Sequence, residues 1–322
     1  MRLSTVLGFV ALAALAASGG AGAAEYPDRT IRIVVPFAAG GGTDLVMRAL
    51  AESVASDWKA SIIIENKPGA GTTLGATSVL SAPADGYTLF ANTASFLITP
   101  HLMSKRPYDA SADFAPVAEV ASSPHVLVVG KHVPAGTLAE FTAWAKGQPA
   151  PATFASFGTG SSSHLGFEIL RHRLGLAMVH VPYRGAAPAL LDVLGGRVDS
   201  MLADLSTVAE HVKTGAVRAI GVAGDARSAA LPDVPTLREA GLDGYGSASW
   251  FGLVVRSGTP PEIVARWNGA LRAALEKDDV RARLAVHGIE PSGTSSEVFG
   301  TFMRAEEAKY VDAIRQSGAK LE

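Results

Sequence analysis

Two glycine-rich segments carry the residues whose types and spacing could bind a ligand. The first, 37–44, reads FAAGGGTD and follows the β-branched run 31–36, whereas the second, 157–164, reads FGTGSSSH and follows the run 152–156. A helix is expected after each segment, so each predicts a strand, a glycine loop and a helix. Such a turn directs unpaired backbone N–H groups and the positive end of the helix dipole at one spot, where an anion can bind.

The residues within each loop have distinct expected roles. In the first loop the three glycines 40–42 allow close backbone approach, and Thr43 or Asp44 can cap the helix. In the second loop Gly158 and Gly160 allow that approach, and the serines 161–163 add hydroxyl donors. A tight turn without a ligand would use the same glycines, so one loop alone is ambiguous. Two such loops favour a carboxylate-binding cleft between two lobes.

The usual catalytic versions of a glycine loop are absent from both segments. Neither continues into the Lys-Ser/Thr pair of a phosphate-binding loop, and segment 40–44 lacks the last glycine of a dinucleotide-binding turn. The serine-rich loop has no Gly-x-Ser-x-Gly elbow. We therefore expect no nucleotide, no cofactor and no catalysis. An exported serine hydrolase that uses 161–163 with His164 is an alternative.

Two further groups of polar residues could do chemistry. His164, Glu168 and His172 are four apart and could share a helix face, but without an HExxH pattern we expect no metal there. Asp199 and Asp204 flank the strand 200–203, and no partner supports a pair of glycosidase carboxylates. Asp204 follows the carboxyl end of that strand, where α/β sheets place ligands, so we expect it near the ligand.

The composition excludes several classes of protein. The 322 residues include 28 Lys and Arg, 30 Asp and Glu and no cysteine, with a formal net charge of -2. A balanced charge without a basic run argues against nucleic acid as a partner. The lack of cysteine excludes disulfides, thiolate metal sites, iron–sulfur clusters and a cysteine nucleophile. The hydrophobic fraction of 48% fits a folded α/β protein.

The first 24 residues are predicted to be a secretory signal peptide. Arg2 is the only charge before Glu25, residues 6–17 are apolar, and Ala21-Gly22-Ala23 matches the cleavage pattern. We expect cleavage near Ala23 or Ala24 and a mature chain in the periplasm. An amino-terminal membrane anchor is the alternative, but the segment is only weakly hydrophobic and no basic residues follow it.

The predicted elements alternate along the mature chain. Strands are expected at 31–36, 61–65, 87–91, 125–130, 152–156, 178–182, 200–203, 219–222 and 250–255, with helices between most of them and at the end. This order predicts an α/β protein of two lobes, each with a mainly parallel sheet flanked by helices. We place one lobe at 25–125 plus 246–322 and the other at 126–245, with crossings near His125 and Trp250.

Motifs along nearly the whole mature chain resemble the periplasmic solute receptors of the tripartite tricarboxylate transporters, the Bug receptor family. They include IRIVVPFAAGGGTD, ENKPGAG, DGYTL, FGTGSSSHLGFEIL, VPYRGAAPALLDVLGGRVD and WFGLVVRSGTPPEIVARWN. The resemblance implies a two-lobed clamp that holds a small organic acid and passes it to membrane permease subunits. Departures from the family pattern are Thr72 for a glycine, Tyr310 for a tryptophan and Phe157 for a smaller residue.

The resemblance also implies which residues bind the ligand. The loop Phe37 to Asp44 matches the carboxylate loop of the first lobe, Ser156 to His164 matches the loop of the second, and Asp204 matches an acidic position that faces the cleft. The expected ligand-binding residues are Phe37, Gly41, Gly42, Thr43, Asp44, Ser95, Ser156, Gly158, Thr159, Gly160, Ser161, Ser162, His164 and Asp204. We expect a monomer that closes on its ligand by a hinge motion.

The loops also indicate which ligands would suit them. Neither loop contains Arg or Lys, so recognition should use backbone donors and bridging waters. An ionised Asp204 in the cleft would disfavour a second carboxylate and favour an ammonium, which makes an amino acid or a monocarboxylate as plausible as citrate. A ligand-sensing subunit for a membrane kinase is a further alternative to the transport receptor.

Overall fold

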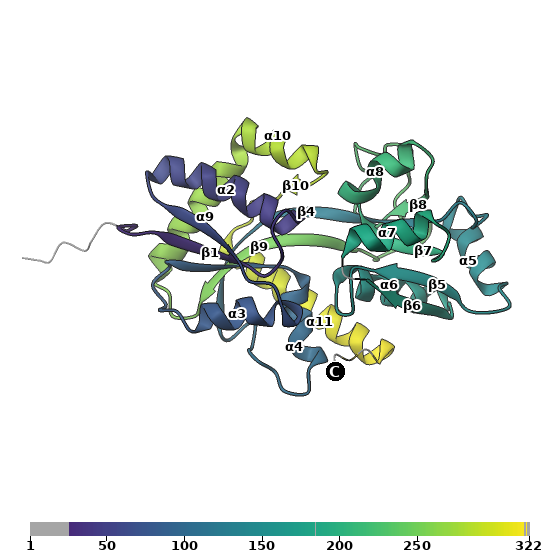
Figure 1. Cartoon of the computed structure of the whole chain (residues 1–322), viewed down its shortest axis with the longest axis horizontal. Coiled ribbons are helices and arrows are strands. Elements are labelled where there is room, and N and C mark those ends of the chain that lie inside the picture. The colour runs from purple at the N-terminus through teal and green to yellow at the C-terminus, as the bar shows by residue number, and fades with distance from the viewer. Residues whose placement is uncertain (1–25, 184, 319, 321–322) are drawn as a thin grey trace, which may run out of the picture.

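Three parallel strands begin the first of two lobes. The computed structural model describes residues 26–183, 185–318 and 320 (Figure 1). Strands β1 (Ile31–Val35), β2 (Ile62–Asn66) and β3 (Thr88–Asn92) pair in the order β2-β1-β3. They alternate with α2 (Gly42–Trp58), the 3₁₀ turn η1 (Ala70–Thr72), α3 (Thr73–Leu80) and α4 (Ala94–Leu102). Thr72 has a φ of 82°, a conformation that favours glycine.

Helices cover both faces of this first sheet because its strands are apolar on both sides. Ile31, Ile33 and Val35 are buried with residues of α2 and of the later helices α9 (Pro261–Glu276) and α10 (Asp278–Val286). Val34 points to the other face, where α3, α4 and α11 (Ser296–Ser317) pack. Because β1 and β3 are parallel and lead into α2 and α4, the amino ends of these two helices lie at the same edge of the sheet.

The second lobe repeats this arrangement with its own parallel strands. Strands β5 (Ala152–Ser156), β6 (Met178–Pro182) and β7 (Ser200–Asp204) pair in the order β6-β5-β7. Their helices are α5 (Leu138–Lys146), α6 (Ser162–Leu174), α7 (Ala186–Leu194) and α8 (Leu205–Lys213), and β8 (Arg218–Val222) completes the sheet. One core cluster includes residues of α5 and α6, and another includes residues of α7 and α8.

Two long antiparallel strands join the lobes into one ten-stranded sheet. Strand β4 (Phe114–Val129) pairs with β9 (Ala248–Arg256) up to Pro124, and from His125 onward it pairs with β7 and β8. The short β10 (Glu290–Pro291) also pairs with β4. The sequence predicted only the part of β4 after His125. Register shifts between Pro116 and Ala118 and between Glu119 and Ala121 interrupt the alternation that would have revealed the earlier part.

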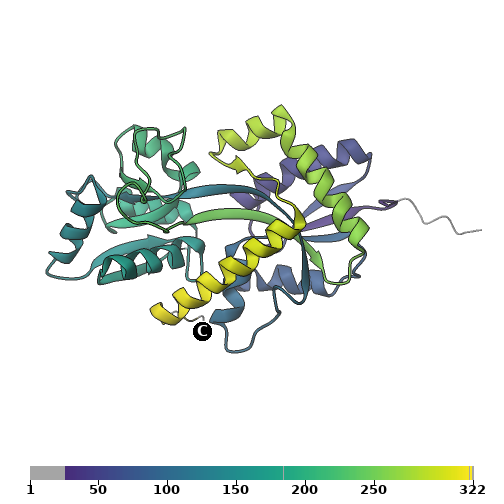
Figure 2. The ribbon, with the colours of Figure 1, turned by 180° about the vertical axis from the view of Figure 1, so that it is seen from behind.

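The lobes also touch on the side that carries α11. Figure 2 shows α11 running across this side of the molecule toward the second lobe. Leu165 of α6 is fully buried in the core cluster that contains Phe96 of α4 and Tyr310 of α11. Gly160 lies against α4, because a Cβ added there would come within 2.6 Å of Leu102 Cδ1. The crossing strands are therefore supplemented by a packed contact between the lobes.

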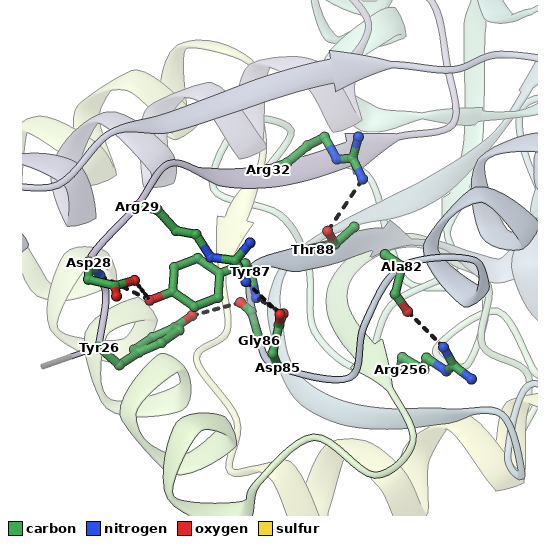
Figure 3. A network of polar contacts seen from close by, with 10 residues as sticks. All are labelled: Tyr26, Asp28, Arg29, Arg32, Ala82, Asp85, Gly86, Tyr87, Thr88 and Arg256. Carbon is green, nitrogen blue, oxygen red and sulfur yellow. Dashed lines mark hydrogen bonds and ion pairs between the residues drawn. The ribbon is translucent and has the colours of Figure 1, made fainter. Parts of the chain in front are cut away.

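A polar and aromatic network fastens the start of the described chain to the first lobe (Figure 3). The Tyr26 hydroxyl donates to the Gly86 carbonyl at 2.7 Å, and Arg29 pairs with Asp85 at 2.6 Å. The Arg29 guanidinium also lies 4.0 Å from the centre of the Tyr87 ring. These contacts hold the segment before β1 at the edge of the sheet away from the α2 and α4 amino ends.

The expected two-lobed α/β fold is confirmed. The predicted signal peptide, 1–24, lies outside the described residues. Within the described ranges, no helix is long and apolar enough to cross a membrane. We propose the predicted division into 25–125 plus 246–322 and 126–245, since β4 changes partners at His125.

Candidate functional site

A cavity of about 480 Å³ lies between the lobes on one face of the crossing strands. Its lining comes from both lobes: Phe37, Gly41, Gly42, Thr43, Thr93, Ala94, Ser95, Ser123, Phe157, Ser161, Ser162, Gly185, Ala186, Asp204, Ser206, Thr207, Ser249, Trp250, Phe251 and Ile289. Five of the described helices begin at this lining. The amino ends of α2 and α4 come from the first lobe, and those of α6, α7 and α8 come from the second.

The amino ends of these helices offer backbone N–H groups to the cavity. The residues before α2, α4, α7 and α8 are Gly41, Thr93, Gly185 and Asp204, and none of their side chains caps its helix. Before α6, Ser161 accepts from the His164 N–H. The N–H groups in the first turn of a helix have no partner within the helix and carry partial positive charge. The cavity therefore suits an anion without a positively charged side chain.

Asp44 stabilises the first loop, 37–44, through the hydrogen bonds of its buried side chain and is not among the described residues that line the cavity. Its side chain is 2% exposed, and its Oδ2 accepts from the Gly40 N–H and from Arg48 Nε, each at 2.9 Å. Its Oδ1 accepts from Asn66 Nδ2, which also donates to the Phe37 carbonyl. Burial acts to raise the pKa of Asp44, but these hydrogen bonds outweigh it and hold the pKa below its usual value. The loop is thus built around an ionised carboxylate.

Two stacked histidines support the second loop in a similar way. The rings of His164 and His180 lie 3.8 Å apart, and His180 Nε2 is 2.6 Å from the Ser156 hydroxyl. The Gly160 N–H donates to His164 Nδ1 at 3.2 Å. Burial, with the neighbouring His180 and Arg171, lowers the pKa of His164 to about 3, and burial with Arg171 lowers that of His180 to about 4. Both rings are neutral at pH 7, so His164 can accept this hydrogen bond.

Asp204 lies where the two crossing strands meet β7. Its Oδ1 accepts from the Ser249 hydroxyl of β9 at 2.6 Å and lies 3.2 Å from Nε2 of His125 in β4. His125 is fully buried and is paired with Asp204 in the register of β4 and β7. Ser162 of α6 approaches the same Ser249 hydroxyl at 3.5 Å. Residues of both lobes therefore meet at this point.

The remaining walls are aromatic and aliphatic. Phe37 and Phe251 come from the first lobe, and Phe157, the larger residue noted in the sequence, comes from the second. Trp250 and Ile289 complete this surface. Among the described lining residues, Asp204 is the only one with a charged side chain, and no Lys or Arg is present. The cavity thus combines apolar walls with backbone and hydroxyl donors.

The predicted ligand-binding residues divide into two groups. Those that line the cavity are Phe37, Gly41, Gly42, Thr43, Ser95, Ser161, Ser162 and Asp204. The others, which are not among the described lining residues, are Asp44, Ser156, Gly158, Thr159, Gly160 and His164. The contacts given above show Asp44, Ser156, Gly160 and His164 bracing the loops. A ligand-binding role for either group stays a prediction. The sequence did not indicate Thr93, Ser123, Gly185, Ser206, Thr207 or Ser249.

The serine hydroxyls of the second loop already have partners. The Ser161 hydroxyl donates to the Gly158 carbonyl at 2.7 Å, and that of Ser163 donates to the Leu202 carbonyl at 2.5 Å. His164 Nδ1 accepts from a backbone N–H, so His164 makes no hydrogen bond with either hydroxyl through that atom. No group of three metal-ligating side chains is found in the part of the chain that is described. His164, Glu168 and His172 thus do not form a metal cluster.

A second cavity, of about 470 Å³, lies on the opposite face of the crossing strands. Ser122 and Ala248 line it, whereas their neighbours Ser123 and Ser249 line the first cavity, as expected from the alternation of side chains along a strand. Trp250 borders both cavities. Neither glycine loop reaches the second cavity, so we take the first as the candidate site.

The fold and the cavity between its lobes define a two-lobed solute-binding protein. The chain is similar to the solved periplasmic binding protein BugD, with a TM-score of 0.78 and 31% identity over 92% of this chain and 100% of that one. It is also similar to Rpa4515 of R. palustris with adipate (TM-score 0.81, 33% identity, 92% and 100% covered). A third such structure is MatC of Rhodopseudomonas palustris with malate (TM-score 0.78, 35% identity, 90% and 100% covered).

Sequence comparisons agree with the structural ones. Protein BugT of Bordetella pertussis is 33% identical over 323 residues, which cover 99% of this chain and 98% of BugT. The family model of the tripartite tricarboxylate transporter family receptor matches residues 46–319. The chain belongs to this family, and the resemblance drawn from its motifs is confirmed.

Proposed function

We propose that this protein is a periplasmic receptor that captures a small carboxylate between its lobes and delivers it to a membrane permease of the tripartite tricarboxylate type. The observation that carries the proposal is the meeting of five helix amino ends, two from one lobe and three from the other, around one cavity. Two similar structures, Rpa4515 with adipate and MatC with malate, support a carboxylate as the ligand class. In this proposal segment 1–24 is removed on export.

Ligand capture follows from the position of the helices. A carboxylate bound first by the α2 and α4 amino ends gains donors from α6, α7 and α8 only when the second lobe approaches. The closed form therefore binds the ligand more tightly than the open form, and binding shifts the population toward closure. Rotation about β4 and β9 near His125 and Trp250 would bring the lobes together. The protein acts as a monomer and leaves its ligand chemically unchanged.

Native mass spectrometry of the gently purified protein tests the proposal. We expect a bound small acid that is lost on unfolding, and a melting temperature that rises with the same acid. A bare protein whose melting temperature is unchanged by a panel of carboxylates and amino acids would contradict the proposal. Capture of permease subunits by the liganded form would support transport, whereas capture of a membrane kinase would indicate a sensing subunit.

Replacing Gly42 with leucine should block the α2 amino end. A Cβ at Gly42 would lie 3.5 Å from Phe251 Cζ, an ordinary contact, so the fold should tolerate the change while the side chain occupies the cavity. We expect the affinity for the captured acid to fall about tenfold or more, because hydrogen bonds to a charged group are lost. Isothermal titration calorimetry measures the effect.

Gly269→Leu is the matched control for Gly42→Leu. Gly269 is exposed on α9, and a Cβ there would meet nothing within 4 Å. This variant should keep the affinity of the wild type and gain about 0.5–1 kcal/mol of stability from helix propensity. Equal affinities in all three proteins would show that the α2 amino end does not contact the ligand.

A further inference from the structure

Both lobes contribute to the second cavity, which lies on the opposite face of the crossing strands from the candidate site. The first lobe supplies Glu119 and Ser122 of β4 and Phe302 and Glu306 of α11, and the second lobe supplies residues 223–228. This is the side of the molecule on which α11 lies (Figure 2). The volume of about 470 Å³ is sufficient for a small organic molecule.

The charged side chains around this cavity leave an excess of negative charge. Its two cations are already paired, Lys309 with Glu306 and Arg227 with Glu239. Three further carboxyl groups line the cavity without a side-chain hydrogen bond or ion pair among the described residues, and they belong to Glu119, Asp225 and Glu290. Each lobe therefore presents a carboxyl group that lacks a counter-charge.

Glu119 is the least exposed of these three residues. Burial, with the nearby Glu306 carboxylate, raises the pKa of Glu119 to about 7. A carboxylate that is partly buried without a partner is unfavourable, and a cation bound beside it would stabilise the ionised form. The side chain is therefore placed to bind a cation that the described residues do not supply.

An aromatic wall adjoins these carboxyl groups. Trp250 and Phe302 line the cavity, and their rings meet edge to face with centres 5.4 Å apart. Trp250 Nε1 donates to Glu306 at 3.3 Å, which fixes the ring in this wall. Aromatic faces attract organic cations. The described residues hold no group of three metal-ligating side chains, so the cavity suits an alkylammonium group better than a metal ion.

The two cavities are coupled through the strands that separate them. Rotation about β4 and β9 that narrows the first cavity widens the second, because the cavities lie on opposite faces of the same strands. A dication that contacts Glu119 of one lobe and Asp225 of the other is bound most tightly when the lobes are close together on this side. Its binding therefore favours the form in which the first cavity is open.

We propose that the second cavity binds a small organic dication, such as an aliphatic diamine, and that its occupation opposes capture of the solute in the first cavity. One ammonium group contacts Glu119, and the other contacts Asp225. The binding of the dication is independent of the proposed receptor function, whereas its effect on capture rests on that function. By linkage, the solute weakens the binding of the diamine by the same factor.

Calorimetry with 1,4-diaminobutane on the full mature protein tests the site. We expect the diamine to bind and butane-1,4-diol, which has the same length and no charge, not to bind. Glu119→Gln should weaken diamine binding about tenfold or more, because a hydrogen bond to a charged group is lost. Glu276→Gln, at an exposed position on α9 and outside the described lining of both cavities, should bind the diamine like the wild type.

The absence of diamine binding, or equal binding of the diol, would overturn the inference. Equal diamine affinity in the wild type and Glu119→Gln would overturn it as well, since the diamine would then bind elsewhere. If Glu119→Gln does not fold, Asp225→Asn removes the exposed carboxylate of the second lobe from the same cavity and should also weaken diamine binding.

A second titration measures the coupling between the cavities. Saturating diamine should raise the Kd of the captured acid at least about fivefold, the lower end of usual coupling factors. An unchanged or lower Kd would refute the opposition between the two sites. If no acid binds to the protein, the proposed receptor function fails, and the diamine titration still decides whether the second cavity is a cation site.

Discussion

Replacing Asp44 with alanine is expected to destabilise the protein by about 3 kcal/mol and to weaken ligand binding. The substitution would leave the Gly40 N–H, the Asn66 amide and the Arg48 guanidinium without the carboxylate that they share. The loop that presents Gly41 and the α2 amino end would then lose its support. Urea unfolding measures the stability, and calorimetry measures the affinity.

Removing the buried carboxylate of Asp44 should destabilise the protein more than removing an exposed carboxylate. Asp57→Ala is a suitable control, since Asp57 is about half exposed and pairs with Lys277 on the surface. Exposed pairs contribute about 0–1 kcal/mol, so this variant should resemble the wild type. If Asp44→Ala unfolds at the same urea concentration as Asp57→Ala and binds the ligand equally well, Asp44 does not hold the loop.

Acid is expected to weaken the second loop through His164. The folded pKa of about 3 lies below the usual value of 6.5, so between these values the unfolded chain binds a proton that the folded chain excludes. The stabilising contribution is therefore complete above pH 6.5 and is lost as the pH falls toward 3. The slope for one such histidine is about 1.4 kcal/mol per pH unit. Urea unfolding between pH 7 and pH 4 measures it.

Two variants test whether His164 causes the pH dependence of the free energy of unfolding. His164→Gln keeps an acceptor for the Gly160 N–H but cannot be protonated, so the free energy of unfolding should depend less steeply on pH. His172→Gln, at an exposed position on the same helix, should keep the slope of the wild type. A slope that is the same in all three proteins would mean that His164 does not exclude a proton in the folded chain.

Much of the fold could be predicted because its elements are marked locally. Strands such as 31–35 and 152–156 are β-branched or apolar runs that are followed by a glycine-rich loop. After each loop, apolar residues recur at the spacing of a helix. The long strand β4 was predicted only in part, since Pro116 and two register shifts disturb its alternation between residues 114 and 121. Its first half is defined by pairing with β9, which lies far away in the sequence.

The site could be predicted less completely than the fold. Its donors are largely backbone N–H groups, and the amino ends of α7 and α8 carry no side-chain pattern that points to a ligand. The position of His164 depends on His180 in the next strand, a contact that spacing along one helix does not reveal. Asp204 was predicted near the ligand because it ends a parallel strand, a position that can be read locally.

The two strands that cross between the lobes, β4 and β9, impose an order on folding during synthesis. The second lobe is built from one continuous stretch of chain that includes the end of β4, so its pairs among β5, β6 and β7 can form as soon as these strands are made. In the first lobe, β9 lies between β3 and β4, and residues up to Arg256 must be available before that sheet is continuous. Pairings this distant in sequence form slowly. The lobe that is started first is therefore the lobe that is completed last.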